Sequence, residues 1–395
     1  MRIAIFSDSF YPELGGIQDS IALAAHTLGA RGHKVQFHVP QASARDFSIA
    51  GIPEREIDLG PDVAIFRYPS FHIPSPTKQS RFVPPTFRRW RALREFAPDV
   101  IHTHTFFGLG WEAVRAARKL DVPLVGTNHS AVAAFADYFP FAKQRLAGLT
   151  FRAVVGYYNN CDFVSGPSRS VIQDMQDLGL HAPADVVSNP INTEAFHPVT
   201  PEEKEALKKK LSFAAATIIY AGRFGIEKNI DVLIRAMAQV RSSLPGAILV
   251  LAGHGSDEPR LRNLIRELDL GASVRFSGTL PHARLAETYQ ASDVFAIAST
   301  SETQSMVLLQ AMNCGLPAIG ADSLSLKEYI PEGAGLRATP GSADDFAAKI
   351  VRVLQDPQRY RQMSASALSF AQQFSPDAVV SRWEEIYGRL SKSAH

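Results

Sequence analysis

The sequence predicts an α/β protein built from two doubly wound halves, each a parallel sheet covered by helices. Short apolar runs alternate with amphipathic stretches along nearly all of the 395 residues, a pattern typical of βα units. The pattern breaks once, over 188–212, into a proline-bearing stretch followed by a charged helix. At about 100–200 residues per domain, the length also favours two or three domains over one. We therefore expect one domain over 1–190 and a second over 191–375.

The first domain opens with MRIAIFSDSF, which indicates a buried first strand. Further apolar runs follow, separated by amphipathic stretches. We expect strands at 2–6, 34–39, 63–67, 99–102, 123–126, 162–165 and 185–187. We expect helices at 16–31, 87–96, 108–119, 141–158 and 169–177.

The second domain repeats this alternation after the break. We expect strands near 216–221, 247–252, 273–276, 293–297 and 317–320. We expect helices at 229–240, 257–268, 282–290 and 305–314, and three closing helices near 342–355, 357–373 and 376–391.

The composition excludes several classes of protein. Hydrophobic residues make up 46% and charged residues 20%, as in ordinary globular proteins and unlike disordered or fibrous ones. The net charge of +2 provides no field that would recruit nucleic acid. Cys161 and Cys314 lie far apart without metal-ligand spacing, which suits a reducing compartment. With no signal-peptide h-region and no apolar run near the roughly 18 residues of a membrane span, we expect a cytosolic protein.

The loops after the strands are where doubly wound folds bind ligands, and the cleft between the halves is the expected site. Gly15 and Gly16 follow the first strand and start a helix. Glycines there either let the backbone approach a phosphate or simply form a turn. The segment 221–228, AGRFGIEK, leaves a strand and offers Arg223 and Lys228 beside a helix start. Two such cations can neutralise a diphosphate without a metal, and the sequence has no D-x-D pair to hold one.

Three further loops contain candidate residues. The GHG of 253–255 lacks the third glycine of a dinucleotide fingerprint, so it argues against a nicotinamide site and makes His254 an ordinary loop histidine. His129 follows a strand and would point into the cleft, although a hydrogen-bonded core histidine is the plainer interpretation. Glu302 precedes a helix in a small polar loop, where it would bind sugar hydroxyls or act as a helix N-cap.

Taken in chain order, these segments resemble the retaining GT-B glycosyltransferases that use nucleotide sugars. The resemblance covers nearly the whole chain. It rests on the ordered set of a GG loop, GTNH, AGR-x4-K, the G-x-G and SGTL loops, and SETQ-x-x-V-L-L-x-A-M-x-C-G-x-P. The group includes diacylglycerol glucosyltransferases and phosphatidylinositol mannosyltransferases.

The resemblance implies a fold of two Rossmann-like domains facing a central cleft. The domain over 1–190 would bind the acceptor, the domain over 191–375 the nucleotide sugar, and the helix over 376–395 would cross back to the first. The activity implied is transfer of a hexosyl unit, with retention, from a donor that we expect to be UDP-linked. The donor is a co-substrate, and no cofactor or metal is expected.

The resemblance also assigns roles to single residues. Arg223 and Lys228 would hold the donor diphosphate, His129 would contact the donor sugar near the reacting carbon, and Glu302 would bind sugar hydroxyls. The other implied donor contacts, including backbone groups at the helix start and a loop against the nucleobase, are Gly15, Gly16, Gly278, Thr279, Leu280, Ser305, Met306 and Val307. Two positions depart from the family. Gln310 replaces a glutamate that grips the ribose, and Ser305 replaces a glycine, so donor identity and affinity stay open.

The acceptor is suggested by a basic segment. Residues 78–94, KQSRFVPPTFRRWRALR, carry six basic and no acidic side chains, interleaved with aromatic residues. Such a segment either lies on an anionic membrane surface or is the solvated face of a domain helix. The residues proposed for the membrane or acceptor are Arg81, Arg88, Arg89, Trp90 and Arg91.

A lipid acceptor is favoured because HTHTFFGLG, GTNHS and SETQ resemble stretches of diacylglycerol glycosyltransferases. The enzyme would then be peripheral on the inner face of the cell membrane. The alternative is a soluble sugar or polysaccharide intermediate as acceptor. Hypotheses of another class are a GT-B nucleotide-sugar epimerase and a catalytically weakened sugar-nucleotide binding protein.

Overall fold

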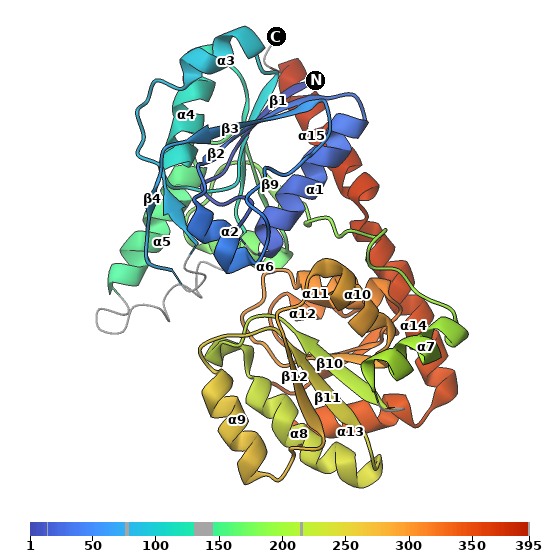
Figure 1. The fold of residues 1–395 in the computed structure, drawn as a ribbon. Coiled ribbons are helices and arrows are strands. Elements are labelled where there is room, and N and C mark those ends of the chain that lie inside the picture. Colours follow the sequence, from blue (N-terminus) through green and yellow to red (C-terminus); the bar gives the residue numbers. More distant parts are fainter. Residues whose placement is uncertain (14, 76–78, 130–144, 214–215, 394–395) are drawn as a thin grey trace. The chain divides into compact units, whose positions relative to one another are not determined.

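The computed structural model describes residues 1–13, 15–75, 79–129, 145–213 and 216–393. The chain divides into two compact units (Figure 1). Unit 1 comprises Met1–Pro190 and Pro376–His395, and unit 2 comprises Ile191–Ser375. Each unit is built around its own parallel sheet, which confirms the predicted fold class.

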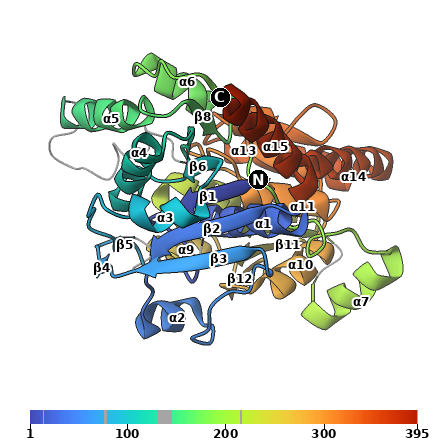
Figure 2. The same ribbon diagram turned by 90° about the horizontal axis from the view of Figure 1, so that it is seen from above.

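Unit 1 contains a seven-stranded parallel sheet in the order β3-β2-β1-β6-β7-β8-β9. Its strands are β1 (Arg2–Phe6), β2 (Lys34–Pro40), β3 (Val63–Tyr68), β6 (Val100–Thr103), β7 (Leu124–Thr127), β8 (Phe163–Gly166) and β9 (Ala184–Val186). Figure 2 shows β1, β2 and β3 side by side. The strand order reverses at β1, which pairs with β2 on one side and β6 on the other. Ligands of open α/β sheets bind at the carboxyl end of such a reversal.

Helices cover both faces of this sheet. They are α1 (Gly16–Ala30), α2 (Ala44–Ala50), α3 (Trp90–Phe96), α4 (Gly108–Leu120), α5 (Arg145–Tyr158), α6 (Arg169–Asp177) and α15 (Pro376–Ser393). A short hairpin adds β4 (Phe71–His72) and β5 (Arg81–Phe82). The C-terminal helix α15 lies beside α1 (Figure 1).

The side chains of β1 point alternately to the two faces of the sheet, and each face has its own hydrophobic core. Ile3 and Ile5 belong to the cluster that includes residues of α1 and α15. Ala4 and Phe6 belong to the cluster that includes residues of α4 and α5. Successive side chains of a strand point to opposite faces, so one buried strand supplies both cores.

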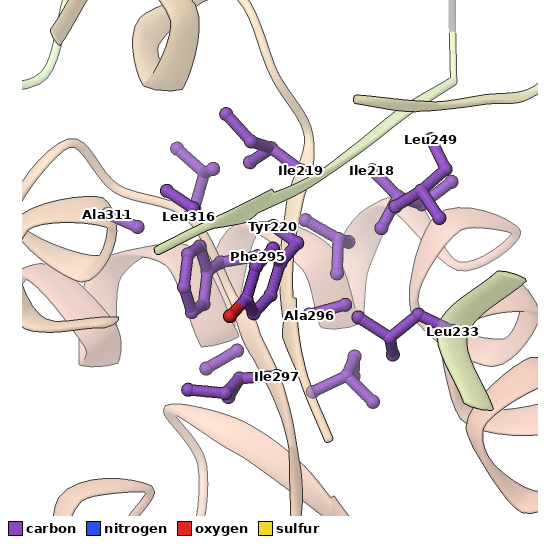
Figure 3. Packing of buried hydrophobic residues seen from close by; sticks show 14 of the residues in the cluster. Ile218, Ile219, Tyr220, Leu233, Leu249, Phe295, Ala296, Ile297, Ala311 and Leu316 are labelled. Carbon is purple, nitrogen blue, oxygen red and sulfur yellow. The ribbon is translucent and has the colours of Figure 1, made fainter. Parts of the chain in front are cut away.

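Unit 2 contains a six-stranded parallel sheet in the order β12-β11-β10-β13-β14-β15. Its strands are β10 (Thr217–Ala221), β11 (Ile248–Ala252), β12 (Val274–Gly278), β13 (Val294–Ile297), β14 (Ala318–Ala321) and β15 (Gly335–Ala338). The order reverses at β10, between β11 and β13. Figure 3 shows part of the buried cluster around this strand, including Tyr220, Phe295 and Leu316.

The helices of unit 2 follow the predicted alternation. They are α7 (Pro201–Leu211), α8 (Ile230–Ser243), α9 (Glu258–Glu267), α10 (His282–Gln290), α11 (Met306–Asn313), α12 (Leu326–Tyr329), α13 (Ala343–Leu354) and α14 (Pro357–Ala371). Single 3₁₀ turns lie at Ile226–Lys228 and Gln372–Phe374. The charged stretch after the break forms α7, which starts with a reciprocal pair of hydrogen bonds between Thr200 and Glu203.

The structure differs from the predicted elements mainly where the elements are short. Helix α2, the β4–β5 hairpin, α12 and β15 were not expected. The helix expected over 87–96 begins only at Trp90, because Phe87 has a left-handed φ of 55° that a continuous helix cannot include. The first residues of the helix expected over 141–158 lie outside the described residues.

Candidate active site

The exit loops of β10 and β11 interlock in unit 2. Phe224 N donates to the His254 carbonyl oxygen at 2.8 Å, and Gly253 lies at φ 134°. A Cβ at Gly253 would collide with the carbonyl oxygen of Gly222, and one at Gly255 with that of Phe224. The GHG sequence therefore serves close backbone packing of two loops, which explains the glycines without a dinucleotide site.

Both candidate cations of unit 2 are ion-paired. The Arg223 guanidinium pairs with Glu227, and Lys228 Nζ lies 2.7 Å from Glu302 Oε1. The 3₁₀ turn at Ile226–Lys228 carries Glu227 and Lys228 together. Arg223 keeps 37% of its side chain exposed and Lys228 keeps 19%. The loops that leave β10 and β13 thus present two cations and two carboxylates, and each cation is paired with one carboxylate.

Glu302 is an ionised carboxylate at the exit of β13. Burial alone would raise its pKa, but the Lys228 ammonium and hydrogen bonds from Lys228 and Ser299 outweigh burial, so its pKa lies below the ordinary value. Its backbone carbonyl accepts a 2.7 Å hydrogen bond from Ser325 Oγ. The N-cap of α11 is Ser305 rather than Glu302, so the capping interpretation of Glu302 is wrong.

The start of α11 presents backbone amides beside this carboxylate. Ser305 occupies the N-cap, and Met306 and Val307 are the first helical residues. The buried Ser305 hydroxyl finds no hydrogen-bond partner among the described residues. The first amides of a helix lack partners within it and favour negative charge. Gln310, one turn further along α11, is buried.

The exit of β12 borders the same interlocked loops. Gly278 has a left-handed φ of 66°, and its carbonyl oxygen accepts a 2.7 Å hydrogen bond from Gly253 N. Thr279 Oγ1 lies 2.6 Å from His254 Nδ1. Gly278 and Thr279 are exposed and Leu280 is half-buried, so this loop has an open face available to a ligand.

In unit 1, the GG loop forms the start of α1. Gly15 is its N-cap in extended conformation, and Gly16 is the first helical residue. A side chain at Gly15 would collide with Gln18, whose amide donates to Ser9 Oγ. Because Gln18 is a flexible side chain and Gly15 has an extended backbone, a side chain at position 15 would require only that Gln18 move.

His129 lies just beyond β7 in unit 1 and is 8% exposed. Its Nε2 lies 3.0 Å from His104 Nδ1. Burial lowers the pKa of His129 to about 4, so the ring is uncharged at neutral pH. The histidine is hydrogen-bonded in the interior, as the plainer interpretation expects, and it lies at the carboxyl end of the sheet.

The basic segment is not one solvated helix. Arg81 Nη1 lies 2.7 Å from Asp46 Oδ2, and Arg89 Nη1 lies 2.6 Å from Oε1 of the fully buried Glu112. These two arginines neutralise interior carboxylates and are not available to a membrane, which corrects that part of the prediction. Arg88 and Arg91 are exposed and Trp90 is half-buried. Lys78 lies outside the described residues.

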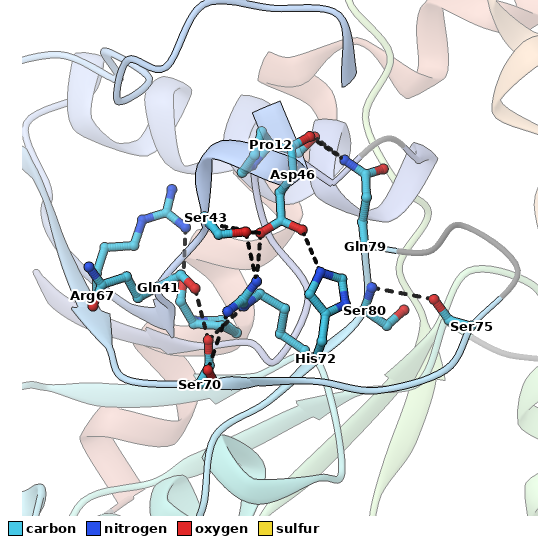
Figure 4. Close-up of polar contacts among 12 residues, drawn as sticks. Pro12, Gln41, Ser43, Asp46, Arg67, Ser70, His72, Ser75, Gln79 and Ser80 are labelled. Atoms are coloured by element: carbon cyan, nitrogen blue, oxygen red, sulfur yellow. Dashed lines mark hydrogen bonds and ion pairs between the residues drawn. The ribbon is translucent and has the colours of Figure 1, made fainter. Parts of the chain in front are cut away.

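Sequence reasoning missed a small polar hollow in unit 1, which has room for little more than one water molecule. Loop residues after β1 and β2 line it together with Asp46, Arg67, Gln79 and Arg81. Figure 4 shows Asp46 in polar contact with Ser43 and His72. Arg81 Nη1 also donates to Asp46. Gln79 Nε2 donates to the Asp46 carbonyl oxygen at 2.9 Å. Of these residues the sequence singled out only Arg81, and as a membrane contact, because Asp46 lies on the unpredicted α2 and Gln79 beside the unpredicted hairpin.

Comparison with known proteins gives the family. Residues 14–195 match the model of Glycosyltransferase Family 4, and residues 203–369 match that of Glycosyl transferases group 1. The alpha-monoglucosyldiacylglycerol synthase of Acholeplasma laidlawii is 26% identical over 98% of this chain and 96% of its own. A GDP-mannose-dependent alpha-mannosyltransferase of Mycobacterium tuberculosis is 27% identical over 100% and 99%. The structure of Anabaena Alr3699/HepE in complex with UDP-glucose superposes with a TM-score of 0.76, 19% identity, and coverage of 99% and 100%.

The chain therefore belongs to the retaining GT-B glycosyltransferases of the family 4 group. It is an enzyme that transfers a glycosyl unit from a nucleotide sugar. This assignment replaces the epimerase and binding-protein hypotheses.

Proposed function

We propose that the enzyme transfers a hexosyl unit from a UDP-linked sugar to a membrane lipid such as diacylglycerol. The observation that carries the donor half of the proposal is the pair of cations, Arg223 and Lys228, in one short strand-exit loop. The acceptor half draws support from the diacylglycerol named in the A. laidlawii relative.

The cations would stabilise the leaving group. Breaking a glycosyl–phosphate bond leaves negative charge on the diphosphate and positive charge on the sugar ring. Fixed cations and the free amides at the start of α11 stabilise the diphosphate without having to reorganise. Arg223 and Lys228 already face carboxylates, so donor binding would exchange one set of anionic oxygens for another.

The sugar would be held by groups of different character. Glu302 is ionised and accepts hydrogen bonds from hydroxyl groups, while its charge favours the developing positive charge on the ring. His129 is uncharged, so it exchanges hydrogen bonds with the sugar without opposing that charge. Gly15, Gly16, Gly278, Thr279 and Leu280 would supply backbone and loop contacts to the donor, and Gln310 would contact the ribose.

The donor experiment compares Arg223→Ala and Lys228→Ala with Arg235→Ala, an exposed arginine on α8 of the same unit. Each site variant should lose at least about a hundredfold in turnover, the usual effect of removing a donor to a developing anion. The control should match the wild type. Wild-type rates in both site variants would overturn the assignment, and stronger thermal stabilisation by GDP-mannose than by UDP-glucose would overturn the UDP donor.

The lipid acceptor draws further support from exposed aromatic residues near the start of α4. Phe71, Phe87, Phe107 and Trp111 are each more than 40% exposed, and Phe87 N is bound to Glu112 of α4 at 2.6 Å. Arg88 and Arg91 add exposed positive charge. Aromatic and basic side chains together suit an anionic lipid surface. Among the described residues, no helix is long and apolar enough to cross a membrane. The location we propose, on the basis of these aromatic and basic side chains, is peripheral, at the cytoplasmic face of the membrane.

Liposome co-sedimentation tests the acceptor proposal. Binding should rise with anionic lipid, fall with salt, and fall again when Arg88 and Arg91 become Glu, since each basic residue near such a surface contributes about 1 kcal/mol. Arg235→Glu is the matched control. Absence of binding would favour a soluble sugar acceptor.

A further inference from the structure

Three histidines of unit 1 meet at the carboxyl ends of two neighbouring strands. His102 lies within β6, His104 follows it directly, and His129 follows β7. Strands β6 and β7 pair in parallel, with His102 opposite Val125. His104 Nδ1 and His129 Nε2 are 3.0 Å apart, and the two rings are nearly parallel at an interplanar angle of 22°. The contact is therefore a specific hydrogen bond between two imidazoles.

This hydrogen bond joins two uncharged rings. Burial lowers the pKa of His129 to about 4 and, together with the neighbouring histidines, holds the pKa of His104 well below its ordinary value. A neutral imidazole carries one N–H, so one ring must donate and the other must accept. The tautomer of His129 therefore depends on the tautomer of His104.

His104 is itself held in place by a second layer. Its ring lies against that of His102, with ring centroids 4.0 Å apart. Both nitrogens of His102 are engaged, Nδ1 with Tyr387 Oη of α15 and Nε2 with Thr127 Oγ1, each at 2.7 Å. The Trp383 ring lies 4.6 Å from His102 as well. The His102 ring therefore has little freedom to rotate, and it limits the rotation of His104.

We propose that His104 is a positioning residue for His129, fixing the orientation of its ring and the nitrogen that carries its proton. The inference rests on the proposed role of His129 at the donor sugar. A side chain that contacts a sugar hydroxyl next to the reacting carbon must present the correct donor or acceptor atom in the correct place. His104 supplies that constraint through a hydrogen bond and the layer behind it, without touching the substrate.

The test compares two substitutions that differ in one property. Asn places an amide atom where His104 has Nδ1, whereas Leu has a similar size and no hydrogen-bonding group. His104→Leu should lower kcat about tenfold or more with little change in the donor KM, and His104→Asn should stay within about threefold of the wild type. His181→Asn, at an exposed histidine of the same unit, is the matched control and should have no effect.

A spectroscopic measurement separates positioning from general stability. Imidazole ¹⁵N spectra of the full-length protein, with the His129 signals identified by their loss in His129→Ala, report the nitrogen that carries the hydrogen. We expect one tautomer in the wild type and in His104→Asn, and a mixture in His104→Leu. A mixture of His129 tautomers in the wild type would overturn the proposal. This measurement needs no variant at position 104, so it tests the proposal even if His104→Leu does not fold.

The outcomes also distinguish this inference from the proposed function. Full activity of His129→Ala would remove the proposed role of His129 itself. An inactive His129→Ala together with wild-type kcat and an unchanged tautomer in His104→Leu would overturn only the positioning role. Equal losses of activity in His104→Asn and His104→Leu, parallel to equal losses in melting temperature, would likewise overturn it.

Discussion

Arg223 and Lys228 in unit 2 are charged and partly exposed, and each faces a carboxylate, whereas His104 and His129 in unit 1 are uncharged, with His129 buried and His104 half-buried. The first pair can exchange partners if a ligand replaces the carboxylate oxygens with phosphate oxygens, because no cation is then left without a counter-charge. The second pair cannot exchange freely, because a buried polar group left without a partner costs about 1–3 kcal/mol. One region is thus suited to binding and releasing a charged ligand, and the other to holding a fixed geometry. Changes of charge should therefore act mainly on unit 2, and changes of pH mainly on unit 1.

The largest effect on activity is expected from Glu302→Gln. The substitution leaves Lys228 without its counter-charge and removes a carboxylate from the proposed sugar site, so kcat/KM should fall about a hundredfold or more. Initial-rate kinetics measure the effect, with Glu267→Gln on the exposed face of α9 as the control. Wild-type kinetics would show that the charge of unit 2 is not part of the site.

A large effect of pH on stability is expected from unit 1. Burial lowers the pKa values of His38 and His102 to about 3 and that of His129 to about 4. In the unfolded chain these groups titrate near 6.5, so between pH 6.5 and 4 the unfolded state binds more protons and stability falls as the pH falls. The loss at pH 5 is about 2 kcal/mol for each histidine.

Urea unfolding between pH 7 and 5 measures this dependence. Unfolding at pH 5 should take up about one proton for each of these histidines. Paired carboxylates such as Glu302 would add their contribution only at lower pH, since its pKa is depressed below the ordinary value. A free energy of unfolding that does not change between pH 7 and 5 would contradict the neutral, buried state of these rings.

A smaller effect is expected from Gln310→Glu. A carboxylate at this position should strengthen the proposed bond to the ribose by about 1 kcal/mol, or about fivefold in the donor KM with kcat unchanged. Gln310→Ala should change the donor KM in the opposite direction. Because Gln310 is buried, a weaker donor affinity in Gln310→Glu alone would mean that the cost of burying the charge exceeds its gain. An unchanged donor KM in Gln310→Ala as well would mean that the proposed ribose contact is wrong.

The smallest effect is expected from chelation. Because Arg223 and Lys228 are proposed to neutralise the diphosphate, EDTA should leave the transfer rate unchanged within error. Activity lost with EDTA and restored by magnesium or manganese would show that these cations do not suffice.

Long, periodic elements could be predicted from the sequence, and contacts between distant residues could not. Strand β1 was predicted because its consecutive apolar residues bury both faces, and α7 because its charges follow a proline-bearing break. Helix α2 and the β4–β5 hairpin are too short for periodicity to reveal them. Arg81 and Arg89 looked solvated because their partners Asp46 and Glu112 lie 35 and 23 residues away.

The same distinction between local pattern and distant contact applies to the candidate site. Strand-exit loops could be predicted because parallel sheets bring ligands to the carboxyl ends of their strands. The partner of each side chain could not, since Lys228 meets Glu302 across 74 residues and His104 meets His129 across 25. Spacing along the chain gives no measure of such distances. The GHG glycines are a case in which the incomplete motif argues against a dinucleotide site, and their conformation serves packing of two loops.

The ion pairs of Arg223 and Lys228 have a consequence for selectivity. In the described structure these side chains carry their own counterions, Glu227 and Glu302, within the protein. A small free anion such as inorganic phosphate would have to displace both carboxylates with few other contacts in return. A nucleotide sugar would offset the same displacement with contacts along its whole length. The internal ion pairs therefore disfavour the binding of small phosphates to these cationic loops. Selection of a nucleotide sugar over a small phosphate then depends on the length of the ligand rather than on its charge.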